Sequence, residues 1–472
     1  MAEDLWRWDA VTLAQAIAAR DISAREAVAS CLQRMRAVNP AINAVTVDLS
    51  AGALEAADRV DRAVARGEPV GPLAGVPVTV KQNTDQAGCA TTSGVVAFAG
   101  VIAEADSPVV AQWKAAGAAI IGRTNTPAFN LRWDSVNDLH GQTRNPFSRG
   151  RTPGGSSGGA AAALAAGIGP LAHGTDLGGS IRYPAYACGV AGLRPTPGRV
   201  ALFNGTAPAE WPPAIQLMAV QGPMARRVRD VRLGFAAMLA PDPRDPWWIP
   251  APQEGPLPPP PIRVAVVEDP AHFGAAAAHP DVRAAVRRAA VALTAAGYAV
   301  EAIPTPGFAR AAELWISLMR VEIRRLLLPL IESLGDDGVR TATRLFLGGG
   351  PEPTMEDYLR ALAERTRLAR QWSLFLERCP LVLAPASLEP PFPLGFDTES
   401  QSRMDAVLDA QRPQLAVPLL GLPAVAVPTG LAGGLPTGVQ IIGPRLREDL
   451  CLAAAEAVEA GMPRLGPWDP AA

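Results

Sequence analysis

Apolar side chains in the first part of the chain follow a helical spacing that begins at clear N-terminal signals. Two capping boxes, T-x-x-Q at 12–15 and S-x-x-E at 23–26, each precede an apolar helical pattern. A capping box satisfies backbone N–H groups at the start of a helix. We therefore expect two helices within residues 12–37 and a third over 51–65.

Short apolar runs and helical patterns then follow each other closely. The run Val76–Val80 predicts a buried strand, Val109–Ala116 a helix and Ala118–Gly122 another strand. An alanine-rich helix is expected over Ser157–Ala166. This order of strand, helix and strand is typical of a partly parallel sheet with packed helices.

The second half has the same alternation after a proline-rich stretch. We expect a helix over Gly222–Leu239 and interpret residues 240–261 as a rigid surface crossing rather than a domain linker. Further elements are expected at Ile262–Val267 (strand), Asp281–Ala296 (helix), Tyr298–Ile303 (strand), 308–334 and 354–378 (helices), Leu381–Ala384 and Gly438–Ile442 (strands), and 448–460 (helix), with Ala424–Pro428 as a further buried run.

Composition narrows the class of protein. The 472 residues are 49% apolar and 19% charged, which is typical of a soluble globule with a large core. A net charge of −2 gives no basis for binding nucleic acid or an acidic membrane. The five cysteines are widely spaced, which predicts neither a zinc site nor a disulfide framework. With a polar N-terminus, this favours a cytoplasmic location.

Two glycine-rich segments contain the candidate chemistry. They are GGSSGG at 154–159 and GTDLGGS at 174–180. Glycines let backbone N–H groups turn toward a ligand, and a serine among them is a candidate nucleophile beside an anion site. The serine still needs a base.

Lysine usage suggests that base. Of 43 basic residues only Lys81 and Lys114 are lysines. A buried lysine can lose its proton near neutral pH, whereas arginine cannot. Lys81 ends the predicted strand at 76–80 and is the candidate base; Lys114 lies in a pattern typical of a helix surface. A lysine that only extends from a strand end to solvent is the alternative for Lys81.

Several stretches together resemble the amidase signature family. Residues 71–81 (GPLAGVPVTVK) are similar to its lysine block, and residues 154–196 to its serine-rich signature. The flanking stretches 122–127, 222–226 and 421–443 are also similar. The departures are Gln82, where many members have Asp, and Arg194, where many have Lys.

The resemblance implies a fold and a set of site residues. The fold is α/β: an α/β/α sandwich around a large mixed, mostly parallel twisted sheet, with residues 1–472 as one domain. In that domain 71–200 would be the catalytic core and about 200–350 the substrate-pocket region. The implied catalytic residues are Ser180 as nucleophile, Ser156 on a cis peptide as proton bridge, and Lys81 as base. The implied oxyanion-hole residues are Leu177, Gly178, Gly179 and Ser180.

Neighbours of these residues are expected to support the loops. Asp176 and Arg182 are predicted to pair, with Thr175 and Ser157 as further loop support. His173 is interpreted as a packed structural histidine and Cys188 as a core residue.

The implied activity is cleavage of a carboxylic amide through an acyl-enzyme, with no metal and no cofactor. An apolar or aryl acyl amide is favoured by the tryptophans and Leu/Met-rich helices after residue 200; these tryptophans are Trp211, Trp247, Trp248 and Trp315. Core packing of these residues is an equal alternative, and an aryl carbamate or ester is chemically open. The expected partner is the small-molecule substrate alone, without nucleic acid or membrane, in a monomer or homodimer.

Three other functions share some of these sequence features. The G-x-S-x-G pattern at 154–158 occurs in α/β-hydrolases, but a loop precedes it and no histidine follows His279. A nucleotide-binding protein could use the glycine loops, but neither lysine follows one as a P-loop requires. The glutaminase-type subunit of a tRNA-dependent amidotransferase would keep the same chemistry and need partner subunits.

Overall fold

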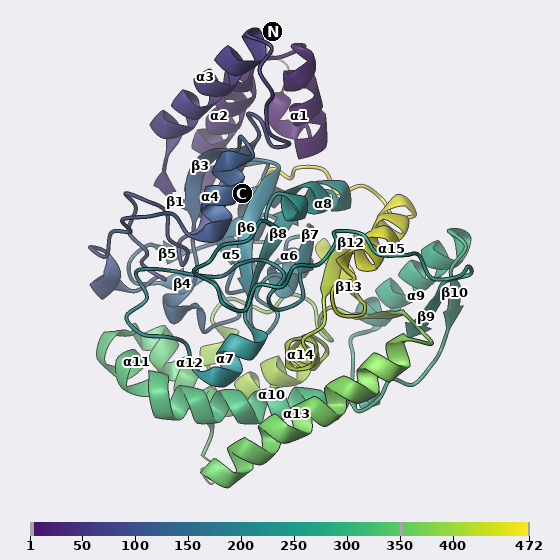
Figure 1. Cartoon of the computed structure of the whole chain (residues 1–472). Helices are drawn as coiled ribbons and strands as arrows, with labels where there is room; N and C mark the ends of the chain where they lie inside the picture. The colour runs from purple at the N-terminus through teal and green to yellow at the C-terminus, as the bar shows by residue number, and fades with distance from the viewer. Residues whose placement is uncertain (1–3, 350–352, 471–472) are drawn as a thin grey trace.

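A single large sheet forms the centre of the computed structural model, which describes residues 4–349 and 353–470. Its eleven strands run in the order β1-β3-β2-β6-β8-β7-β12-β13-β11-β9-β10 (Figure 1). The strands are β1 Val45–Asp48, β2 Pro77–Lys81, β3 Ala119–Thr124, β6 Leu171–Asp176, β7 Ala191–Arg194, β8 Val220–Ala225, β9 Arg263–Val266, β10 Ala299–Glu301, β11 Leu381–Pro385, β12 Ala424–Ala432 and β13 Leu435–Ile442. A separate small sheet pairs β4 (Val136–Asn137) with β5 (Gly141–Gln142).

Helices cover both faces of the sheet. They are α1 Ala10–Ala19, α2 Ala24–Ile42, α3 Ser50–Ala65, α4 Pro108–Ala115, α5 Gly158–Ala165, α6 Arg182–Ala187, α7 Pro213–Met218, α8 Val228–Ala236, α9 Pro280–Ala295, α10 Phe308–Glu322, α11 Leu328–Leu334, α12 Asp337–Leu347, α13 Met355–Leu376, α14 Gln401–Leu420 and α15 Glu448–Ala460. One core includes α4, α8, α9 and α15, and a second includes α2, α5 and α6. A third core joins the sheet to α10, α12, α13 and α14, which lie at the bottom of Figure 1.

The strand sequences are apolar because both faces are buried. Along β12, Val425 and Val427 pack into the core with α8, α9 and α15, while Ala426 packs into the core with α5 and α6. Successive side chains of a strand point to opposite faces, so a strand covered on both sides needs an unbroken apolar run.

The predicted α/β/α fold is confirmed, with one refinement of the sheet. In the described part of the chain, six of the ten neighbouring strand pairs are antiparallel and four are parallel. The sheet is therefore mixed but less parallel than the sequence indicated. The long proline-rich stretch crosses the surface and contacts the body, since Arg199 donates to the carbonyl of Pro252.

The helix predicted over Gly222–Leu239 is wrong in its first part. Residues Val220–Ala225 form the central strand β8, and only Val228–Ala236 is helical. Proline is rare in central strands because it donates no backbone hydrogen bond, so Pro223 argues against a strand at this position. Local sequence does not indicate α14 either, since Pro413 and Pro418 interrupt its helical pattern.

No helix in residues 4–349 and 353–470 is long and apolar enough to cross a membrane.

Candidate active site

Lys81 and the 174–180 segment meet because their strands are parallel neighbours. Val78 of β2 pairs with Leu171 of β6, and Thr79 pairs with Ala172. Continuing this register brings Lys81 level with Gly174. Both strands end at the same edge of the sheet, so the lysine side chain and the second glycine loop share one site.

The Lys81 amine is fully buried and has two hydroxyl partners. Its Nζ lies 2.7 Å from Ser156 Oγ and 2.9 Å from Thr175 Oγ1. Asn83 also donates to Thr175 Oγ1, at 3.3 Å. Thr175 and Ser156 therefore both hold the amine. Because Lys81 is completely buried, the alternative in which its side chain extends to solvent is excluded.

Burial changes the acid–base character of Lys81. Desolvation lowers the pKa of its ammonium well below the ordinary value of 10.5, and the Asp176 carboxylate opposes this only in part. Removing a charged group from water disfavours its charged form. A neutral amine is therefore accessible here at a lower pH than for a lysine in water.

Ser156 follows the one non-proline cis peptide of the described residues, Gly155–Ser156. A Cβ at Gly155 would lie 2.3 Å from the carbonyl oxygen of Arg132, so only glycine fits there. The next residue joins the two loops: the N–H of Ser157 donates to the carbonyl of Ser180 (3.2 Å). Ser157 Oγ accepts the N–H of Thr175 (3.3 Å).

Ser180 stands at the end of the second loop and lines the same cleft as Ser156 and Thr175. Within the described residues, no hydrogen bond joins Ser180 Oγ to Ser156 Oγ. The structure thus places Ser180 close to the pair formed by Lys81 and Ser156, with the Ser157–Ser180 backbone bond as the direct link between the loops.

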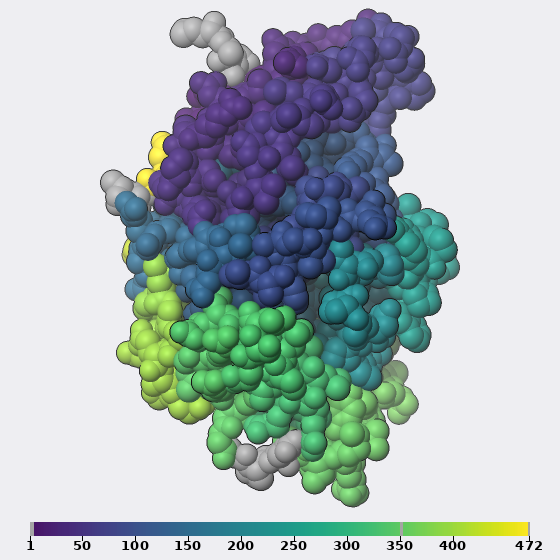
Figure 2. All heavy atoms as spheres, turned by 90° about the vertical axis from the view of Figure 1, so that its left-hand side faces the viewer, coloured from purple at the N-terminus to yellow at the C-terminus, as the bar shows by residue number. Residues whose placement is uncertain are grey.

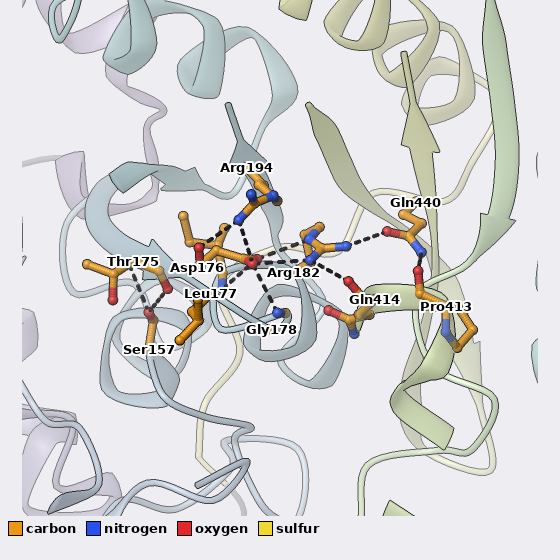
Figure 3. Close-up of polar contacts among 12 residues, drawn as sticks. Ser157, Thr175, Asp176, Leu177, Gly178, Arg182, Arg194, Pro413, Gln414 and Gln440 are labelled. Atoms are coloured by element: carbon orange, nitrogen blue, oxygen red, sulfur yellow. Dashed lines mark hydrogen bonds and ion pairs between the residues drawn. The ribbon is translucent and has the colours of Figure 1, made fainter. Parts of the chain in front are cut away.

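Asp176 is the centre of a buried network (Figure 3). Its carboxylate accepts bonds from Arg182 Nε (3.0 Å) and Nη2 (3.1 Å) and from Arg194 Nη1 (3.2 Å). All three side chains are fully buried. Burial alone would raise the pKa of Asp176, but the two guanidinium groups hold it well below its usual value. The pairing of Asp176 with Arg182 was predicted from sequence; that of Arg194 was not.

Arg182 extends this network to the C-terminal half of the chain. It donates to Gln440 Oε1 (2.8 Å) and to the carbonyl of Gln414 (2.9 Å). The Gln440 amide in turn donates to the carbonyl of Pro413 (Figure 3) and to that of Pro385. The second glycine loop is thereby fixed to β13 and α14.

The backbone N–H groups of this loop have different partners. The N–H of Gly179 donates to Asp176 Oδ1 (3.0 Å). The N–H groups of Leu177, Gly178 and Ser180 have no such partner among the described residues. Of the four donors implied by the family resemblance, three are available to an oxyanion here, and Gly179 is committed to the Asp176 carboxylate.

His173 and Cys188 are packed in the core and do not take part in the site. Both are fully buried, and His173 Nε2 lies 2.7 Å from Gln221 Oε1. Burial lowers the pKa of His173 to about 3, so it is neutral at physiological pH. His173 is the packed histidine and Cys188 the core residue that the sequence predicted.

Two spaces share Ser180 in their lining; we call the larger one the outer cleft and the smaller one the inner cavity. The outer cleft, about 660 Å³, has Phe98, Phe129, Leu131, Trp211 and Leu327 among its walls. In Figure 2 the blue, teal and green segments that supply these walls meet on the face toward the viewer.

The inner cavity, about 60 Å³, lies against Trp133, Trp315, Phe346 and Met404. Leu177 and Ser180 line both spaces. A larger hollow of about 870 Å³ lies beside α3 and contains neither serine loop, so its size does not make it the site.

Two tryptophans were not identified from sequence as backbone partners. Trp315 Nε1 donates to the carbonyl of Leu177 (3.0 Å), and Trp133 Nε1 to that of Gly178 (3.2 Å). Trp247, a candidate for the pocket, is 69% exposed and lines neither space. Within the described residues, no cluster of three His, Cys, Asp or Glu side chains could hold a metal ion.

Comparison with known proteins identifies the family of this chain. The family model described as Amidase matches residues 26–452. The chain is 44% identical to an indoleacetamide hydrolase of Bradyrhizobium diazoefficiens, over 96% of this chain and 86% of that protein. It is 35% identical to a glutamyl-tRNA(Gln) amidotransferase subunit of Acidothermus cellulolyticus, over 97% and 95% of the two chains.

A solved structure gives the same result for the fold. The crystal structure of a bacterial aryl acylamidase of the amidase signature family superposes with a TM-score of 0.82 at 26% identity, covering 98% of this chain and 97% of that one. The eleven-stranded mixed sheet, the family model and the relatives agree over nearly the whole length. The chain therefore belongs to the amidase signature family of amide hydrolases.

Proposed function

We propose that this protein is a stand-alone amidohydrolase that cleaves small apolar or aryl acyl amides through an acyl-enzyme on Ser180. The observation that carries the proposal is the fully buried contact of 2.7 Å between Lys81 Nζ and Ser156 Oγ, beside Ser180. A serine nucleophile needs an adjacent base. Lys81 has a lowered pKa and a hydroxyl partner that can pass on a proton.

The first half of the proposed reaction makes the acyl-enzyme. Neutral Lys81 takes the proton of Ser156, and Ser156 takes the proton of Ser180 as Ser180 Oγ attacks the amide carbon. The negative charge on the former carbonyl oxygen is stabilised by the N–H groups of Leu177, Gly178 and Ser180. The proton held on Lys81 returns through Ser156 to the leaving nitrogen, the C–N bond breaks, and the amine departs.

The second half hydrolyses the ester on Ser180. A water molecule gives its proton to the Ser156–Lys81 pair and attacks the acyl carbon. The carboxylic acid leaves, and Ser180 Oγ regains the proton. Each half therefore uses the same base and the same oxyanion donors.

The lining of the site supports an apolar or aryl acyl group. Phe98, Phe129, Leu131 and Trp211 line the outer cleft, and Trp133, Trp315 and Phe346 the inner cavity. Pockets with mostly apolar walls and few polar groups bind apolar ligands. Relatives that are named an indoleacetamide hydrolase and an aryl acylamidase support an arylacetamide as the first substrate to test.

A second candidate function is the glutaminase-type subunit of a tRNA-dependent amidotransferase. The 35% identity to such a protein over 97% of the chain favours it. A subunit of this kind would hydrolyse glutamine only with its partner subunits. The greater identity to a hydrolase supports independent activity, which we propose for a monomer or homodimer in the cytoplasm.

The test is a substrate panel with two variants. Purified wild type is assayed on aryl amides, aliphatic amides, glutamine, aryl carbamates and esters, beside Ser180→Ala and Lys81→Ala. We expect the highest kcat/KM on an aryl amide and no measurable activity in Ser180→Ala. Full activity of Ser180→Ala, or activity on glutamine alone, contradicts the proposal.

A further inference from the structure

The five carbonyls of residues 176–180 in the second glycine loop are each held by a donor other than the loop's own N–H groups. The acceptors, with their donors, are Asp176 O with Arg194 Nη1 (2.7 Å), Leu177 O with Trp315 Nε1 (3.0 Å), Gly178 O with Trp133 Nε1 (3.2 Å), Gly179 O with the Tyr183 N–H (2.7 Å) and Ser180 O with the Ser157 N–H (3.2 Å). The first four of these peptides carry the candidate oxyanion donors, the N–H groups of Leu177, Gly178, Gly179 and Ser180. The fifth carries the Ile181 N–H, which donates to Asp176 Oδ2 (3.2 Å).

Holding a carbonyl fixes the direction of the N–H on the same peptide. The peptides between 176 and 180 are trans, since the cis bonds of the described residues lie elsewhere. In a planar trans peptide the C=O and N–H point in opposite directions. The bond from Trp315 to Leu177 O therefore directs the Gly178 N–H away from Trp315. In the same way, the bond from Arg194 to Asp176 O directs the Leu177 N–H away from Arg194.

Trp315 is well placed to hold its peptide without moving. It lies on α10, and its ring is 5% exposed and meets Phe346 edge to face at 6.2 Å. A Cβ on Gly178 would lie 2.5 Å from Trp315 Cζ2, so the loop backbone rests directly on the indole. A hydrogen bond from a side chain locked by packing keeps a catalytic donor aligned before the substrate arrives.

We propose that Trp315, from a helix outside the glycine loops, is a positioning residue that aligns the Gly178 N–H of the oxyanion hole. This inference rests on the proposed function, because it requires Ser180 to be the nucleophile. The aligned Gly178 N–H stabilises the tetrahedral intermediate, in which the oxygen carries a negative charge, more than it stabilises the planar substrate. Through this N–H, Trp315 therefore contributes to kcat, separately from the contact that its ring offers to substrate in the wall of the inner cavity.

The test replaces the indole by a ring without the N–H donor. In Trp315→Phe we expect kcat to fall about 10-fold or more with KM nearly unchanged, since removing an oxyanion donor outright costs about 10²–10³ in kcat. An aryl boronic acid, which forms a tetrahedral adduct on a serine, should lose affinity by a similar factor. Affinity for a planar aryl amide, measured with Ser180→Ala in both backgrounds, should not change.

Trp372→Phe is the matched control. Trp372 is fully buried, and its Nε1 has no hydrogen-bond partner among the described residues. This variant loses the same atoms from a core and should keep both kcat and boronate affinity. If Trp315→Phe does not fold, 3-benzothienyl-alanine at position 315 keeps the ring shape and removes only the N–H.

The outcomes separate the inference from the proposed function. Unchanged kcat and boronate affinity in the Trp315 variants overturn the inference, as does an equal loss for the boronate and the planar amide. Activity that survives Ser180→Ala overturns the proposed function instead, whatever Trp315 does.

Discussion

The two glycine loops and the helical wall from α10 to α12 face each other across the site and are built in opposite ways. The loops contain almost no side-chain bulk, and their geometry is set by buried ions and backbone hydrogen bonds around Asp176. The wall consists of large apolar side chains such as Trp315 and Phe346, and a π-helical turn at Ile323–Leu327 interrupts it.

In the proposed mechanism the loops carry out the chemistry, and the wall recognises the substrate. A change in the loops alters the position of proton donors and acceptors, for which small displacements are costly. A change in the wall alters volume and apolar contact, which cores tolerate more easily. Trp315 is the exception, because its ring belongs to the wall and its N–H holds the loop.

The largest effect is expected when the proposed catalytic base beside the loops, Lys81, is replaced. Lys81→Met removes the proton acceptor with little change in volume, and we expect kcat/KM to fall about 10²–10⁴-fold. Lys114→Met, the control, removes an exposed lysine paired with Asp106 and should change nothing. The measurement is kcat/KM on the best substrate of the panel.

The pH profile sharpens the same prediction. The proposed mechanism requires neutral Lys81, so wild-type kcat/KM should rise with pH and reach its plateau well below pH 10.5, because burial lowers the lysine pKa. A kcat/KM that falls as the pH rises from 6 to 9 would contradict a lysine base. Any activity left in Lys81→Met should lose this rise.

A smaller effect, on stability as well as rate, is expected at the centre of the loop network. Asp176→Asn leaves Arg182 and Arg194 buried without a carboxylate, which should lower the free energy of unfolding by about 3–5 kcal/mol. The pKa of Asp176 is depressed, so this stabilisation is present at neutral pH and is lost only in acid. Chemical denaturation at pH 7 measures it.

The exposed pair Arg360–Glu356 gives the comparison for that measurement. Glu356→Gln should change the unfolding free energy by less than about 1 kcal/mol. An equal, small loss for Asp176→Asn would mean that the loops are not held by the buried ions.

The smallest effect is expected in the wall. Trp211→Ala enlarges the outer cleft and should reduce the preference for aryl over aliphatic amides about 10-fold, mainly through KM. Trp247→Ala removes an exposed indole outside both spaces and should leave the preference unchanged. A fall in kcat alone for Trp211→Ala would assign it to the chemistry rather than to recognition.

Much of the loop region could be predicted from sequence, because its chemistry depends on unusual residues at fixed local spacings. The glycine runs at 154–159 and 174–180 indicated candidate serines, the rarity of lysine indicated Lys81, and the family resemblance implied the roles of Ser156 and Ser180. Lys81 meets the second glycine segment because β2 and β6 are parallel and end together, whereas its contact with Ser156 depends on the loop before α5.

The rest depends on contacts between distant segments, which local patterns do not encode. Trp315 meets Leu177 from 138 positions away, and Arg194 joins Asp176 from a strand that the sequence did not indicate. The hydrogen bond from the Gly179 N–H to Asp176 depends on the side-chain orientation of Asp176, which belongs to the same loop. Pro223 in β8 and Pro413 in α14 are tolerated because surrounding structure outweighs local propensity.

The central claim is that Ser180, and not a neighbouring serine, carries the acyl group. The direct measurement is peptide mass spectrometry of the protein after reaction with a 4-nitrophenyl arylacetate and an acid quench. We predict a single arylacetyl adduct on Ser180, absent from Ser180→Ala. An adduct on Ser156 or Ser157, or turnover without any adduct on Ser180, would contradict the account.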